Sequence, residues 1–196
     1  DVERRAQWEA CRRMAELGAV AAEVRASLGK LGADPNLWIE RYTAKDGLYR
    51  LDQAQRQLEA RGATLEDDPE ERPLGVVRRA YDDACRAMAE GFGRALSEAG
   101  WTVTGSLHQT RIFSEVVSER PRPVAYLLVD ALRFEMGLEL AERLPKGCEV
   151  SVRHAIAALP TITPVGMAAL QPGASASFTV VEEGGRLGAR IDGAFL

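Results

Sequence analysis

Two threonines in a proline-rich stretch are the first residues whose type and place could support chemistry. The stretch LPTITPVGMAALQPG covers residues 159–173 and carries Thr161 and Thr163. Proline disfavours helical geometry in the residue before it and suits the first position of a helix. Pro164 therefore predicts that Thr163 is the N-cap of a short helix over 165–170, whereas Thr161 lies in the preceding loop without such a constraint.

A threonine at this position has two compatible roles. As an N-cap it accepts a hydrogen bond from the first helical turn and stabilises the helix by about 1 kcal/mol. The same helix end presents unpaired N–H groups and the positive end of the helix dipole, where a phosphate could bind. A hydroxyl beside that phosphate, with its pKa lowered by a metal ion, could attack phosphorus. Taken alone, the residues favour capping for Thr163 and leave nucleophilic catalysis open.

Asp130 is the second candidate, because it directly follows an apolar run. Residues 124–129, VAYLLV, are typical of a strand that is buried on both faces of a parallel sheet. Ligands gather at the carboxyl ends of such strands, where a carboxylate can bind a divalent cation. Asp130 could equally cap the helix that follows. Arg133, in the first turn of that helix, could pair with a phosphate or with Asp130, or could be a solvated surface charge.

These candidates lie in residues 122–196, whose pattern is that of an α/β domain. Apolar residues repeat every four positions over 132–144 and predict an amphipathic helix, and residues 148–157 are typical of a second strand. A strand, a helix and a strand in this order are the building block of an α/β sheet. Glu-Gly-Gly between two short strand-like runs over 178–191 indicates a hairpin.

Residues 1–121 form a helical region by their periodicity. Apolar residues recur at three- and four-residue spacing over 14–31, 46–60 and 74–96, which predicts three helices. Five acidic residues and two prolines within 65–73 indicate an exposed connector. Segment 106–118 is ambiguous and slightly favours a helix. The large aromatic residues are expected in the core or at helix interfaces: Trp8, Trp38, Tyr42, Tyr81 and Trp101.

Composition excludes several classes of protein. With 46% hydrophobic and 28% charged residues, the chain should fold rather than stay disordered. The net charge of −4 gives no overall basic bias toward nucleic acid, although a local basic groove stays open. No apolar run approaches the roughly 20 residues that span a bilayer, and we expect a cytoplasmic protein. Three widely spaced cysteines predict reduced, mostly buried thiols: Cys11, Cys85 and Cys148.

Taken together, the two motifs resemble a known family. VDALR at 129–133 and LPTITPVGM at 159–167 resemble the start of the PglZ domain, a branch of the alkaline phosphatase superfamily, and the similarity extends over 124–196. Residues 42–58 resemble the segment that precedes this domain in phage-defence proteins of the BREX type. The resemblance implies a doubly wound sheet and a metal-dependent phosphoesterase, which is a phosphodiesterase, a phosphatase or a nuclease. It also implies two zinc ions, or manganese or magnesium in their place.

Carried over position by position, the resemblance makes Asp130 the first metal ligand. Thr163 becomes the nucleophile and a further metal contact. Arg133 belongs to the family's Asp-x-x-Arg pattern, which by itself assigns it no role, and we expect it to bind substrate. The remaining ligands of such sites lie far downstream, so we expect this 196-residue chain to hold an incomplete metal site and to be inactive by itself.

The resemblance also implies partners. The expected partners are other proteins of the defence complex. The expected substrate is a phosphate ester or a nucleic acid, and no association with a membrane is expected. The alternative is a non-catalytic scaffold of a multiprotein defence complex, whose helices in residues 1–121 bind partner proteins.

Overall fold

The computed structural model describes residues 2–62 and 71–196. The chain divides into two compact units, each with its own buried core. Unit 1 comprises Asp1–Thr104 and Phe134–Met136, and unit 2 comprises Gly105–Arg133 and Gly137–Leu196. Within the two described ranges, no helix is both long enough and apolar enough to cross a membrane.

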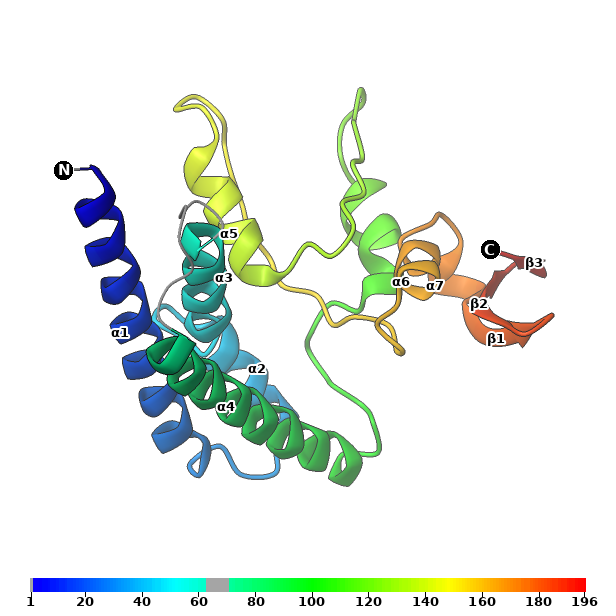
Figure 1. The fold of residues 1–196 in the computed structure, drawn as a ribbon. Coiled ribbons are helices and arrows are strands. Elements are labelled where there is room, and N and C mark those ends of the chain that lie inside the picture. Colours follow the sequence, from blue (N-terminus) through cyan, green and yellow to red (C-terminus); the bar gives the residue numbers. More distant parts are fainter. Residues whose placement is uncertain (1, 63–70) are drawn as a thin grey trace. The chain divides into compact units, whose positions relative to one another are not determined.

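Long helices dominate unit 1: α1 (Val2–Leu28), α2 (Pro35–Thr43), α3 (Arg50–Gly62) and α4 (Glu71–Glu98) (Figure 1). Helix α1 packs against both α3 and α4. The apolar stripes of the sequence supply the core, which confirms the three predicted helices. Their fully or nearly fully buried members include Met14, Leu17, Ala21, Val24, Leu48, Leu51, Leu58 and Ala84. Residues 65–70 of the predicted connector lie outside the described residues. Its last three residues, 71–73, are helical and begin α4.

The apolar periodicity does not predict α2, which the structure adds. The carboxylate of Asp34 accepts a hydrogen bond at 2.9 Å from the N–H two residues further on, and Pro35 occupies the first turn. Trp38 of this helix is buried against Gly91 of α4, where any Cβ atom would overlap the indole ring. Gly91 is thus required for the close approach of these two helices.

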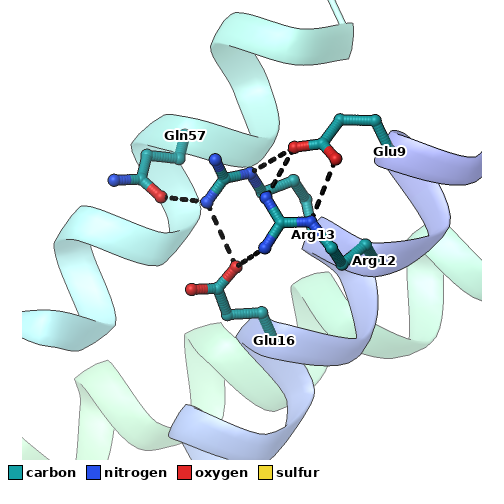
Figure 2. Close-up of polar contacts among 5 residues, drawn as sticks. All are labelled: Glu9, Arg12, Arg13, Glu16 and Gln57. Atoms are coloured by element: carbon teal, nitrogen blue, oxygen red, sulfur yellow. Dashed lines mark hydrogen bonds and ion pairs between the residues drawn. The ribbon is translucent and has the colours of Figure 1, made fainter. Parts of the chain in front are cut away.

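Polar contacts also link the helices of unit 1. On α1, Arg12 and Arg13 pair with Glu9 and Glu16, and Arg13 also donates a hydrogen bond to Gln57 of α3 (Figure 2). The hydrogen bond from Arg12, together with the charges of both arginines, lowers the pKa of Glu9 to about 2. This network therefore joins α1 to α3 through the charged guanidinium of Arg13 and the neutral amide of Gln57.

Asp52 of α3 connects three helices. Its carboxylate accepts hydrogen bonds from the hydroxyls of Tyr42 on α2, at 2.9 Å, and Tyr81 on α4, at 3.1 Å. Burial, followed by the neighbouring Cys85 and Asp52, raises the pKa of Tyr81 far above its ordinary value. Tyr81 therefore stays protonated and acts as a donor to Asp52.

The first turn of α5 (Phe134–Arg143) completes unit 1. The ring of Phe134 lies 5.6 Å from that of Tyr49 in an edge-to-face arrangement, a favourable geometry for aromatic rings. Glu135 is fully buried, and its Oε1 lies 3.9 Å from Nε of Arg56 on α3. The opposite charge offsets part of the cost of burying this carboxylate.

Two predictions about burial hold only in part: Trp38 is buried, and Tyr42, Tyr81 and Cys85 pack against the core, but other members are exposed. Trp8 and Trp101 are 70% and 63% exposed, because Trp8 lies off the stripe that begins at Ala10 and Trp101 follows the end of α4. Cys11 and Cys148 are exposed as well. Burial follows from the side of the element on which a residue lies, and residue type alone does not reveal it.

Unit 2 contains short helices and a small sheet. Its elements are η1 (Gln109–Arg111), η2 (Phe113–Val117), the rest of α5, α6 (Thr163–Ala169), α7 (Ala174–Ser177), β1 (Thr179–Glu183), β2 (Arg186–Ile191) and β3 (Ala194–Phe195). The strands form an antiparallel sheet in the order β1-β2-β3, next to α6 and α7 (Figure 1). Gly184 and Gly185, both with positive φ, connect β1 to β2, which confirms the predicted hairpin.

The predicted parallel sheet is absent from the described parts of the chain. Residues 124–129 and 148–157 belong to no strand, and a single bridge between Ile156 and His108 is parallel. Burial alternates along 124–129, so that Leu127 is 81% exposed while Leu128 is half-buried. A parallel strand needs paired neighbours and cover on both faces, and this run is covered on one face only. The fold is mixed α/β, and the doubly wound sheet is not confirmed.

Candidate functional site

Asp130 lies where the extended run 124–129 ends and the chain turns. The turn is made by Ala131, whose φ of 54° is in the left-handed region. The N–H of Ala131 donates a hydrogen bond to Oδ1 of Asp130 at 2.9 Å. Helix α5 starts only at Phe134, with Arg133 at its cap position and no side-chain cap. Asp130 does not cap α5, so that alternative is wrong, and its second oxygen is available for another contact.

That contact comes from Thr163. Its hydroxyl Oγ1 donates a hydrogen bond to Oδ2 of Asp130 at 3.1 Å, and both side chains belong to exposed residues. The two residues are 33 positions apart in the sequence and both lie in unit 2. The structure thus brings together the two candidates that the sequence proposed separately.

The predicted N-cap role of Thr163 is wrong by one residue. Helix α6 begins at Thr163 itself, Ile162 occupies the cap position, and no side chain caps the helix. The carbonyl of Ile162 accepts the first helical bond, from the N–H of Gly166 at 2.9 Å. Pro164 falls in the first turn, where its missing N–H costs nothing. The hydroxyl of Thr163 makes no capping hydrogen bond and instead donates to Asp130.

Arg133 is exposed at the cap position of α5, three residues after Asp130. The hydrogen bond between Asp130 and Thr163 does not involve it. Arg133 lies on the same turn as Asp130, and this position is compatible with its predicted role in substrate binding.

The pair supplies two oxygen atoms that one divalent cation could contact. Among residues 2–62 and 71–196, no group of three or more His, Cys, Asp or Glu side chains could hold a metal ion. Zinc usually takes three or four protein ligands, so these residues do not fit a zinc site by themselves. Magnesium fits better, because it is commonly held by one or two carboxylates together with waters and substrate phosphates.

His108, one of two histidines in the chain, has a local role. It caps η1, where its Nδ1 accepts a hydrogen bond from the N–H of Thr110 and lies 2.8 Å from the hydroxyl of the same residue. Burial and the nearby Arg111 lower the pKa of His108. A neutral imidazole engaged in a cap explains this histidine without a metal.

Tyr126 is a residue of this region that the sequence analysis did not single out. Its hydroxyl donates a hydrogen bond to the carbonyl of Leu170 at 3.2 Å, and its ring lies 6.0 Å from that of Phe113. Tyr126 is the one polar tip within the apolar run 124–129, and a buried tyrosine hydroxyl usually has a partner. That rule could have identified the residue but could not have named its partner.

Comparison with known protein families gives a class of domain for the region that contains Asp130 and Thr163. Residues 108–184, which include Asp130, Arg133 and Thr163, match the family model of an alkaline phosphatase-like domain. The family is the BREX system PglZ alkaline phosphatase-like domain, which confirms the predicted resemblance and implies a role in phage defence. No curated protein and no solved structure gives a significant match.

Proposed function

We propose that the protein carrying this chain is a metal-dependent phosphoesterase of a phage-defence system. The observation that carries the proposal is the 3.1 Å hydrogen bond from Thr163 to Asp130, within a segment that matches a family of alkaline phosphatase-like domains. Neither side chain caps a helix, so the ordinary structural reasons for these residues do not account for the pair.

In this proposal Thr163 is the nucleophile. The hydroxyl loses its proton to water as Oγ1 attacks phosphorus, the bond to the leaving oxygen breaks and that oxygen takes up a proton from water, and a further water later hydrolyses the phosphothreonine ester. Asp130, which already accepts the hydrogen bond of this hydroxyl, orients it toward the substrate. A divalent cation bound by Asp130 and Thr163 would lower the pKa of the hydroxyl and offset phosphate charge. Arg133 would bind a phosphate oxygen, because guanidinium groups pair well with phosphates.

The Asp130–Thr163 pair offers two oxygen atoms, which suit magnesium or manganese and, together with the further ligands that the resemblance implies, zinc as well. The proposed substrate is a phosphate ester, including the phosphodiesters of nucleic acids, and the proposed partners are other proteins of the same defence system. A scaffold function is less well supported, because the helical stripes on which it rested are buried in the core of unit 1.

Turnover of a chromogenic phosphodiester by the intact protein tests the proposal. With magnesium, manganese or zinc added in turn, we expect Thr163→Ala and Asp130→Asn to lower kcat/KM on the order of 1,000-fold. Thr163→Ser should retain part of the activity because it keeps a hydroxyl. Thr161→Ala is the matched control, since Thr161 is exposed in the loop just before α6 and should behave as the wild type. Wild-type turnover by Thr163→Ala would show that the assignment is wrong.

A further inference from the structure

One side chain binds the main chain on both sides of Thr163. Gln109, the first residue of η1, uses both atoms of its amide. Its Nε2 donates a hydrogen bond to the carbonyl of Gly166 at 3.0 Å, and its Oε1 accepts one from the N–H of Ala158 at 3.0 Å. Ala158 precedes the loop 159–162 and Gly166 lies in the first turns of α6, so the amide spans this loop and the start of the helix.

The main chain of Gln109 is fixed to the same region. Its N–H donates to the carbonyl of Ile156 at 2.8 Å, and the N–H of Ile156 donates to the carbonyl of Leu107 at 2.7 Å. Gln109 is half-buried, so these bonds are partly shielded from water. A neutral amide has one donor end and one acceptor end, so the two side-chain bonds determine its orientation.

The loop itself has little packing to define its position. Ala158, just before the loop, and Val165, in the first turn of α6, are buried, but Leu159 and Ile162 of the loop are 56% and 39% exposed. Thr163 follows this loop as the first residue of α6, which packs through the buried Val165, Ala168 and Ala169, so the bonds of Gln109 determine how the loop joins that helix.

We propose that Gln109 is a positioning residue that sets the distance between Oγ1 of Thr163 and Oδ2 of Asp130. Its consequence for turnover rests on the proposed phosphoesterase function, whereas its consequence for the loop rests on geometry alone. A displacement of about 1 Å can cost on the order of 100-fold in rate, so a residue that touches no substrate can still limit catalysis.

Amide hydrogen exchange of the intact protein tests the geometry without any assay of activity. Gln109→Leu removes both side-chain bonds, and we expect the N–H of Ala158 to exchange about five- to tenfold faster. Gln109→Glu keeps an acceptor for Ala158 but lacks the donor for Gly166, so Ala158 should stay protected. Gln171→Leu is the control, because Gln171 is also half-buried and donates to a carbonyl of α6 without spanning the loop.

A thiol introduced by Thr163→Cys reports directly on the distance to Asp130. A neighbouring carboxylate raises the pKa of a thiol, and the rate of alkylation against pH measures that pKa. Adding Gln109→Leu to this variant should lower the pKa of the introduced thiol toward its ordinary value of about 8.5, because the loop moves away from Asp130. Peptide mass spectrometry separates this thiol from the three native cysteines.

In the phosphodiester assay, Gln109→Leu and Gln109→Glu should each lower kcat about 10- to 100-fold and change KM less than about threefold. If Gln109→Leu changes neither the exchange of Ala158 nor the pKa of the introduced thiol, the positioning role is wrong. The positioning role is also wrong if Gln171→Leu reproduces both effects. If both readouts change but Thr163→Ala keeps full turnover, the positioning role stands and the phosphoesterase proposal fails.

Discussion

The hydroxyl of Tyr126 donates a hydrogen bond to the carbonyl of Leu170, and this bond ties the run that ends at Asp130 to the end of helix α6. Thr163 begins the same helix. Burial raises the pKa of Tyr126, so its hydroxyl remains a donor at neutral and moderately alkaline pH. Tyr126 thus links the segment before Asp130 to α6, and Gln109 links η1 to the main chain on both sides of Thr163.

Tyr126→Phe should weaken this support while keeping the ring in place. We expect the free energy of unfolding to fall by about 1 kcal/mol, the value of one hydrogen bond, and turnover to fall several-fold. Tyr49→Phe is the control, because Tyr49 contacts Phe134 through its ring. Thermal unfolding and phosphodiester turnover measure the two effects, and equal losses in both variants would argue against the hydrogen bond.

Neighbouring leucines in the run 124–129 should respond differently to a polar substitution. Leu127 is 81% exposed and Leu128 is half-buried. Leu127→Gln should leave the free energy of unfolding unchanged, and Leu128→Gln should lower it by about 1 kcal/mol or more. Denaturant unfolding of both variants measures these free energies. Comparable destabilisation by both variants would instead indicate a strand buried on both faces, as the sequence predicted.

Asp52→Ala should destabilise unit 1, because it removes the acceptor for Tyr42 and Tyr81 together. Two hydrogen bonds to a charged acceptor suggest a loss of about 3 kcal/mol or more in the free energy of unfolding. Asp82→Ala on the exposed face of α4 is the matched control and should change stability by less than about 0.5 kcal/mol. A similar loss for both would show that helix propensity, rather than the tyrosine contacts, accounts for the effect.

Glu9 predicts a specific dependence of stability on acid. Its pKa is lowered from 4.5 to about 2 in the folded chain, so its stabilising contribution is present above pH 4.5 and is lost as the pH falls toward 2. Glu9→Gln should therefore have a lower melting temperature than the wild type at pH 6, and the difference should vanish near pH 2. Because Glu9 is near the surface, 1 M salt should shrink the difference at pH 6 as well. A difference that persists unchanged at pH 2 would contradict this origin.

Local patterns in the sequence determined most of the helices and the hairpin. The stripes through Leu17, Leu51 and Ala84 require burial on one side of each helix, and that requirement holds wherever the helix packs. Gly184 and Gly185 permit positive φ at adjacent positions, which defines a two-residue turn without reference to the rest of the chain. The motifs also identified Asp130 and Thr163 as candidates, since each follows from residue type and immediate neighbours.

Only the tertiary structure decided what those candidates do. Whether the hydroxyl of Thr163 caps α6 or reaches Asp130 depends on the distance between segments 33 residues apart, which no local pattern encodes. The bridge from Gln109 to Ala158 and Gly166 joins residues up to 57 positions apart, so it was equally hidden from the sequence. The apolar run 124–129 had the composition of a strand, but strand pairing is a property of neighbours in space, and the described chain places none beside it.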